Sequence, residues 1–103
     1  MTLANVPAPA EGEAAAVRRD VRVTSPQGLH ARPAARVVET ARRFRARISL
    51  LHGATRASAK DLLDVLYLAA PHGTALVVEA LGDDAEHAAD ALVALFSSLA
   101  EER

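Results

Sequence analysis

The chain lacks cysteine and tryptophan, and aromatic residues make up only 3% of its 103 residues. Without cysteine there are no disulfides, no thiolate chemistry and no zinc held by cysteine. No apolar run approaches the roughly 20 residues that a membrane-spanning helix needs. The N-terminus also lacks the basic flank and apolar centre of a signal peptide. We therefore expect a cytoplasmic protein with no membrane insertion, no metal and no cofactor.

Acidic residues are scarce in the first half of the domain, and basic residues are scarce in the second half. Residues 18–60 hold eleven of the twelve Lys and Arg but only two acids, whereas residues 61–103 hold nine acids and one base. The first half therefore offers a basic face to an acidic partner. For a single arginine, such as Arg36, Arg42 or Arg43, simple solvation of the surface is the more economical interpretation.

The composition changes near residue 20. Residues 1–17 are rich in Ala, Pro and Glu and show no hydrophobic period, which is typical of a flexible segment. We expect a flexible leader over residues 1–19 and a single small domain over residues 20–100. The half of the chain that is hydrophobic is largely alanine, so the core should be thin.

Alternating and helical periods divide this domain into seven elements. Alternation from Asp20 predicts a first strand, a hairpin follows over residues 46–51 and 55–59, and an apolar run over 74–81 predicts a fourth strand. Helical spacing predicts a helix from near Pro33 to residue 44, another over 62–70 and a last one over 85–99. The order βαββαβα favours an α+β open-faced sandwich, a four-stranded antiparallel sheet with three helices on one face.

Each of the three predicted helices has a recognisable start signal. Proline is tolerated only in a first helical turn, so the first helix should start within about three residues of Pro33 and place His30 at or beside its N-cap. Asp61 can cap the second helix. Asp83 and Glu86 have the spacing of a capping box for the last helix.

The position of His30 suggests phosphoryl chemistry. A helix N-terminus presents unpaired N–H groups and a partial positive charge, which bind phosphate and disfavour a charged imidazolium. A neutral imidazole has a lone pair that can attack phosphorus. The backbone N–H groups of Ala31 and Arg32 could then bond the phosphoryl oxygens, and the Arg32 side chain could add a charge-assisted contact. Gly28 lets the chain turn sharply and leaves the ring uncrowded.

The residues alone leave a plainer interpretation open, in which His30 caps a turn and Arg32 is a surface residue. No second catalytic residue, metal site or pocket chemistry accompanies them, so a stand-alone catalyst is the least favoured class. His52, His72 and His87 are scattered and lack matching carboxylates, and we expect surface residues there instead of metal ligands. Tyr67 is expected to pack the middle helix against the sheet edge or a partner.

The stretch "GLHARPAA" resembles the active-site signature of the HPr family, the histidine phosphocarriers of the bacterial phosphoenolpyruvate:sugar phosphotransferase system. Residues 58–96, from "SAKDLL" to "VALF", resemble the rest of that family, and the likeness runs from Asp20 to Leu99. The resemblance implies the same βαββαβα order. It also implies a phosphoryl group carried on Nδ1 of His30, with Arg32 as the active-site arginine.

The resemblance further implies enzyme I as the phosphoryl donor and sugar-specific IIA domains as acceptors, with the protein acting as a monomer. One departure concerns regulation. Many members carry a serine at the start of the middle helix that a dedicated kinase phosphorylates, and here that position is Asp61, with Ser58 in the strand before it. We therefore expect no control by that kinase at this position.

Two other functions compete. A regulatory paralogue, phosphorylated at the same His30 but serving nitrogen metabolism or a dihydroxyacetone kinase, would have much the same sequence. A nucleic-acid binder would suit the basic first half, but RNA-binding sheets stack bases on strand aromatics. None of Phe44, Tyr67 and Phe96 falls on a predicted strand, so we expect no nucleic acid partner.

Overall fold

The computed structural model describes residues 16–101. Its elements follow the predicted order, with a short 3₁₀ turn at the end. They are β1 (Val17–Arg22), α1 (Ala31–Ala41), β2 (Arg47–His52), β3 (Thr55–Ser58), α2 (Leu62–Tyr67), β4 (Ala75–Leu81), α3 (Ala85–Ser98) and η2 (Leu99–Glu101).

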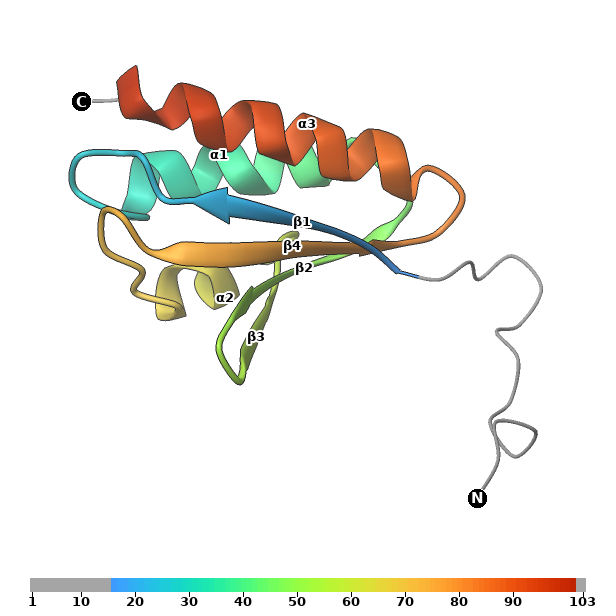
Figure 1. Cartoon of the computed structure of the whole chain (residues 1–103), viewed down its shortest axis with the longest axis horizontal. Helices are drawn as coiled ribbons and strands as arrows, with labels where there is room; N and C mark the ends of the chain where they lie inside the picture. Colours follow the sequence, from blue (N-terminus) through green and yellow to red (C-terminus); the bar gives the residue numbers. More distant parts are fainter. Residues whose placement is uncertain (1–15, 102–103) are drawn as a thin grey trace.

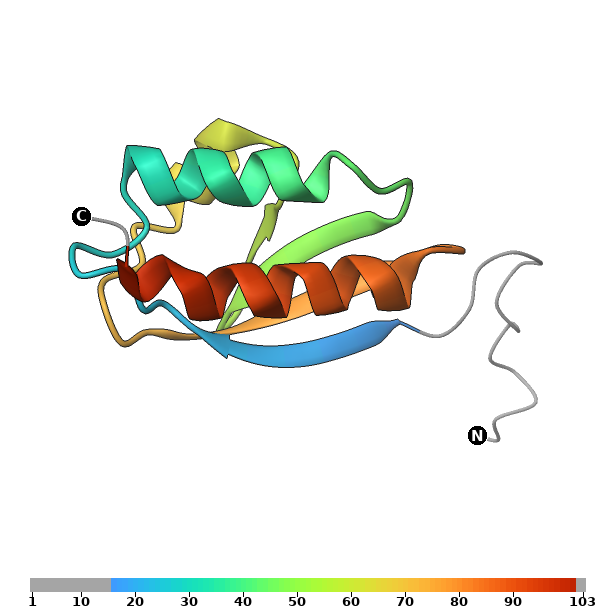
Figure 2. The same cartoon turned by 90° about the horizontal axis from the view of Figure 1, so that it is seen from above.

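The four strands form one antiparallel sheet in the order β1-β4-β2-β3. Helices α1 and α3 lie side by side on one face of the sheet, as Figures 1 and 2 show, and α2 packs against α1 and β3. No helix of residues 16–101 covers the other face of the sheet. The predicted α+β open-faced sandwich is thus confirmed.

The core lies between the sheet and the two long helices. The predicted stripe of α1 is buried at Ala34, Val37, Val38 and Ala41. Facing it are inward residues of the central strands and of α3, of which five are less than 2% exposed: Ile48, Leu50, Val78, Leu92 and Phe96. Burying these apolar side chains holds the helices on the sheet.

Two predicted boundaries were wrong. Strand β1 begins at Val17 and not at Asp20, because Val17 to Arg19 pair with β4; residues 1–15 of the expected leader lie outside the described residues. Helix α2 ends at Tyr67, because the backbone turns to a positive φ of 47° at Ala69. Pairing with β4 thus extends β1 beyond its local pattern, and the turn at Ala69 ends α2 before its local pattern ends.

The capping box predicted for the last helix was also wrong. The N-cap of α3 is Asp84, and its side chain makes no capping bond. Its carboxylate accepts hydrogen bonds from the backbone N–H groups of Arg45 (2.9 Å) and Ala46 (2.8 Å) instead. These bonds tie the start of α3 to the turn before β2 and hold the pKa of Asp84 below its ordinary value.

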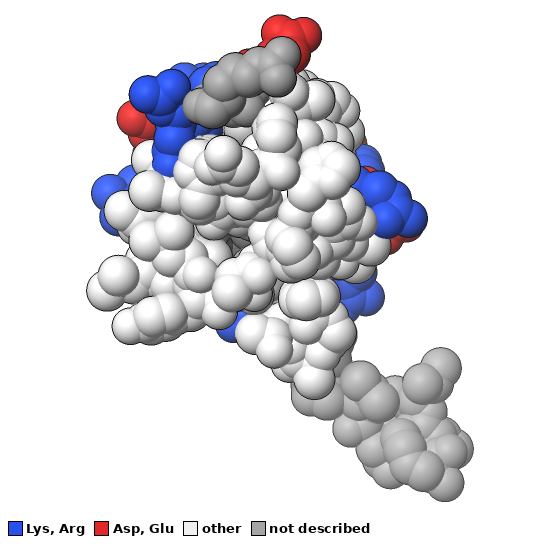
Figure 3. Space-filling view, turned by 90° about the vertical axis from the view of Figure 1, so that its left-hand side faces the viewer, with Lys and Arg blue, Asp and Glu red and all other residues white. Residues whose placement is uncertain are grey.

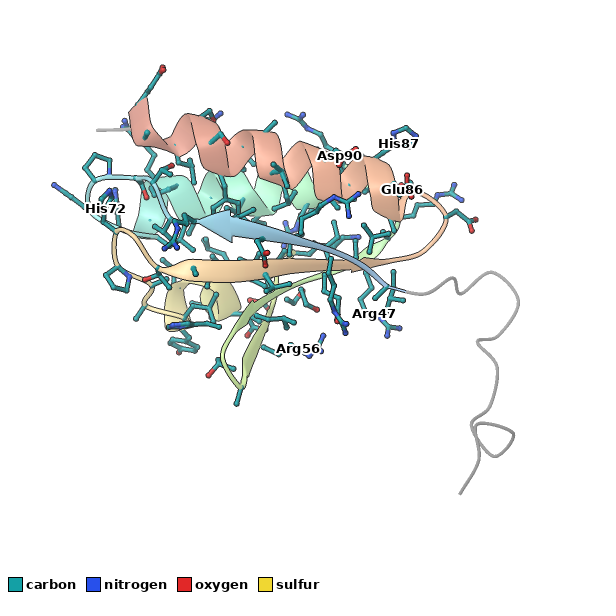
Figure 4. The ribbon with its side chains drawn as sticks, viewed as in Figure 1. Arg47, Arg56, His72, Glu86, His87 and Asp90 are labelled. Atoms are coloured by element: carbon teal, nitrogen blue, oxygen red, sulfur yellow. The ribbon has the colours of Figure 1, made fainter. Side chains whose placement is uncertain are left out.

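Three charged residues form two ion pairs across the open face of the sheet. Glu79 on β4, only 5% exposed, accepts hydrogen bonds from Arg56 of β3 (2.6 Å) and Arg18 of β1 (2.7 Å). In Figure 4, Arg56 and Arg47 project on the side of the sheet away from α3. Hydrogen bonds from the guanidinium groups of Arg56 and Arg18 hold the pKa of the Glu79 carboxyl below its ordinary value, so the buried acid stays charged and joins both edge strands to the centre.

Candidate functional site

His30 is the N-cap of α1, as predicted. Its backbone is extended (φ −80°, ψ −169°), and its side chain makes no capping hydrogen bond. The residue is partly exposed. A capping histidine would use its ring to accept a hydrogen bond from the helix. The ring of His30 makes no such bond and is therefore available for other interactions.

The helix end beside His30 carries unpaired backbone donors. The first helical hydrogen bond runs from the N–H of Ala34 to the carbonyl of His30 (2.9 Å). The amides before it, those of Ala31 and Arg32, belong to the first turn, where a helix has no acceptor for them. Pro33 has no N–H to satisfy and is buried. An anionic group on His30 would thus meet two N–H groups and the positive end of an 11-residue helix.

Arg32 stands in the first turn of α1 with an exposed side chain. No partner of its guanidinium lies among residues 16–101. The side chain is therefore available to a phosphoryl group on the neighbouring residue, whose charge it would complement. Figure 3 looks at the end of the molecule where α1 begins, and there acidic side chains occupy only the margin.

The backbone before His30 is held by a segment forty residues further along the chain. Gly28 has a φ of +80°, and a Cβ there would lie 2.6 Å from the carbonyl oxygen of Ala70. The N–H of Leu29 donates to that same carbonyl (2.9 Å), and the hydroxyl of buried Ser25 donates to the carbonyl of Gly28 (2.7 Å). Gly28 is thus needed for close approach of the two segments, a reason the sequence did not reveal.

A shallow hollow opens beside the histidine. Its volume is about 360 Å³, and it is lined by Gln27, Leu29, His30, Leu66, Ala69, Ala70 and Pro71. The sequence analysis did not predict the wall from α2 and the loop after it, because Gly28 was interpreted only as a turn residue that leaves the ring uncrowded. A larger hollow of about 670 Å³ lies against β1, β2 and β4 and contains no histidine.

Asp61 caps α2 as predicted. Its carboxylate accepts a hydrogen bond from the N–H of Asp64 (3.2 Å), and the carboxylate of Asp64 accepts one from the N–H of Ser58 (3.2 Å). The N-terminus of α2 therefore has its own acceptor and an acidic first turn. Unlike the start of α1, the start of α2 is capped by its own side chain and does not leave the N–H of Asp64 available to a ligand.

The remaining residues singled out in the sequence do not line the hollow at His30. His52 is the last residue of β2, beyond which the hairpin turns; His72 lies in the loop before β4 and His87 on α3, and all are exposed. Within residues 16–101 no cluster of three metal-ligating side chains occurs. Tyr67 is 79% exposed, so packing against the sheet edge, the first of its two predicted roles, was wrong, and contact with a partner stays a prediction.

Comparison with protein families gives a match over nearly the whole described chain. The profile of the HPr component of the phosphotransferase system, described as a phosphorylation site, matches residues 17–98. The phosphocarrier protein HPr of Haemophilus influenzae is 41% identical over 81 residues, which are 79% of this chain and 95% of that protein. That of Treponema pallidum is 38% identical over 86 residues, 84% of this chain and 98% of that protein.

Solved structures agree with these sequences. The crystal structure of HPr from Thermoanaerobacter tengcongensis superposes with a TM-score of 0.80 at 33% identity, covering 84% of this chain and 98% of that one. HPr from Bacillus anthracis superposes with a TM-score of 0.75 at 36% identity, covering 80% of this chain and 98% of that one. The likeness thus extends through both sequence and fold.

Proposed function

Since the chain belongs to the HPr family of phosphocarrier proteins, we propose that His30 accepts a phosphoryl group from enzyme I and passes it to IIA domains of sugar permeases. The observation that carries the proposal is the open start of α1. There, in the part of the chain that the structure describes, three features meet at the positive end of a helix: a histidine ring without a capping bond, two backbone N–H groups without a helical acceptor, and an arginine without a partner.

The transfer follows from these groups. The Nδ1 lone pair, the nitrogen that the family implies, attacks phosphorus on the donor's phosphohistidine. A new N–P bond forms as the donor's N–P bond breaks, and the donor nitrogen keeps the electron pair. The N–H groups of Ala31 and Arg32 and the Arg32 guanidinium bond the phosphoryl oxygens, where negative charge gathers in the transition state. Transfer to the acceptor repeats the step in reverse.

Protein partners suit the surroundings of the site better than small molecules do. The hollow at His30 is open and shallow, and α2 beside it exposes Leu63 (60%) and Tyr67 (79%). Large apolar side chains exposed together mark protein interfaces. A partner that covers them would bring its own histidine to His30 and exclude water from the exchange. Among the described residues no helix has the length and apolar character to cross a bilayer.

The test is incubation with enzyme I and labelled phosphoenolpyruvate, followed by a panel of IIA domains and regulatory acceptors. We expect one acid-labile phosphoryl group, as a phosphoramidate would be, and no label in His30→Ala. Undiminished labelling of that variant would contradict the assignment of His30. The acceptor that takes the label fastest distinguishes sugar transport from a nitrogen-type or dihydroxyacetone kinase system.

A further inference from the structure

Ala69 has a backbone conformation that alanine rarely adopts. Its φ is 47°, and every other residue with a positive φ among those described is a glycine: Gly28, Gly53, Gly73 and Gly82. The left-handed region brings Cβ of an L-residue close to the following carbonyl, whereas glycine enters it freely. Ala69 therefore holds a strained backbone at the point where α2 ends.

Packing of the Ala69 methyl group against residues 16–101 does little to offset the free-energy cost of this backbone conformation. The side chain of Ala69 is exposed, so it contributes little buried apolar area. The backbone bond at this residue, from its N–H to the carbonyl of Leu66 (3.0 Å), would be made equally well by glycine. A strained residue that the fold does not require points to function.

The position of Ala69 relates it to the histidine. Ala69 lines the hollow together with His30 and Leu66. The next residue, Ala70, supplies the carbonyl that accepts from Leu29, directly before His30. Ala69 is thus one of the apolar residues around the hollow beside His30.

We propose that Ala69 is a positioning residue whose methyl group confines the His30 ring and shields its phosphorylated form from water. The inference rests on the proposed function. The reaction that the wall opposes is hydrolysis. A water oxygen bonds to phosphorus as the N–P bond breaks, the ring nitrogen keeps the electron pair and takes one proton of the water, and inorganic phosphate leaves with the other proton. An apolar wall on one side of the ring reduces the approaches open to that water.

The experiment compares the full-length protein with Ala69→Gly. Both are phosphorylated chemically with the small-molecule donor phosphoramidate, so that the test does not depend on enzyme I. Relief of the strain should raise the melting temperature of Ala69→Gly by about 4 °C. The lifetime of the phosphohistidine should nevertheless fall, by about two- to tenfold. A merely structural residue would not move these two readouts in opposite directions.

Two further variants serve as controls. Gly53→Ala introduces alanine at a φ of +60° with open space around its Cβ, in the β2–β3 hairpin away from His30. It should lower the melting temperature by a similar amount and leave the phosphohistidine lifetime unchanged. Ala69→Ser keeps a Cβ in the wall and should retain the parent lifetime.

An unchanged lifetime in Ala69→Gly, with the parent clearly phosphorylated at His30, would overturn this inference and leave the proposed function intact. A lower melting temperature of Ala69→Gly would show that the backbone is not strained and would also overturn it. A parent that takes no phosphoryl group on His30 would overturn the proposed function and this inference together.

Discussion

The first turns of α1 and α2 both contain backbone N–H groups that have no acceptor within the helix. The N-cap residues of the two helices differ in whether they supply one. Both N-caps have an extended backbone, His30 with ψ −169° and Asp61 with ψ 115°. Asp61 accepts a bond from its own helix, whereas the ring of His30 does not. A capped end is stable and closed to ligands, and an uncapped end keeps its N–H groups available.

The start of α3 extends this comparison. The side chain of Asp84 makes no capping bond to its own helix, yet its carboxylate and Glu86 in the first turn leave negative charge there. The first turn of α2 likewise contains Asp64, and only that of α1, among the three helices described, contains no acid. The combination of an open end and no acidic charge is what suits α1 to an anion.

The largest effect should come from closing α1. We expect His30→Asp to abolish phosphorylation by enzyme I and to stabilise the fold by about 1 kcal/mol, because the new carboxylate caps the helix and suits its positive end. Label incorporation and chemical denaturation measure the two changes. His30→Ala is the control, since it loses the label without gaining a cap. Equal stability of the two variants would contradict the idea that the end of α1 is left open at a cost in stability.

Removing the arginine from the open end should have the next largest effect. A guanidinium bonded to a phosphoryl oxygen is worth about 1.5–3 kcal/mol. We therefore expect Arg32→Ala to slow transfer by roughly ten- to hundredfold with hardly any change in melting temperature, since the side chain has no partner among the described residues. Rapid-quench kinetics with enzyme I measure the rate. A well-folded variant with the parent's rate would exclude the role.

Opening α2 should affect stability more than transfer. Asp61→Ala removes the cap and should cost about 1 kcal/mol, while Asp61→Ser keeps a capping oxygen and should cost less. Transfer from enzyme I to Asp61→Ser should stay within a few-fold of the parent (about 1 kcal/mol or less). A large gain in transfer on this substitution would show that Asp61 inhibits His30 and that its role is not confined to capping.

The regulatory prediction concerns the same residue. A phosphoserine would bring a charge of about −2 and three acceptor oxygens, against −1 and less bulk for aspartate. Asp61 is therefore a poor mimic of the phosphorylated state. Incubating the parent with HPr kinase and ATP should add no phosphate near residue 61, and phosphopeptide mapping checks this. Phosphate found on Ser58 would mean that serine control persists at a different residue.

The smallest effect should appear in acid, at the start of α3. The pKa of Asp84 is lowered, chiefly by the N–H of Arg45, from an ordinary value of 3.8. Its contribution to stability is therefore complete above that value and is lost as pH falls through the lower, folded-state pKa. Denaturation of Asp84→Asn between about pH 5 and about pH 2 should show a shallower loss of stability than the parent. Parallel curves would contradict it.

Local signals predicted the open end of α1 well, and non-local contacts account for what they missed. The missing N–H of Pro33 constrains where a helix can begin, and the side chain of Asp61 bonds three residues along, so both caps are local events. The wall at Ala69 to Pro71 depends on a turn packing against Gly28, which no local pattern describes. Asp84 was missed as the N-cap because its carboxylate bonds Arg45 and Ala46 across the fold.

The order of the strands also bears on how the protein folds during synthesis. Among the strands of residues 16–101, β1 pairs only with β4. The earliest of these four strands to be synthesised therefore gains its partner only when the last has left the ribosome. Until residues up to Leu81 have emerged, the loop that leads from β1 to His30 lacks the carbonyl of Ala70 and the sheet beneath α1. Long-range pairings of this kind form late. A nascent or truncated chain should therefore present no competent histidine to enzyme I, and phosphoryl groups should pass only to molecules that are completely made.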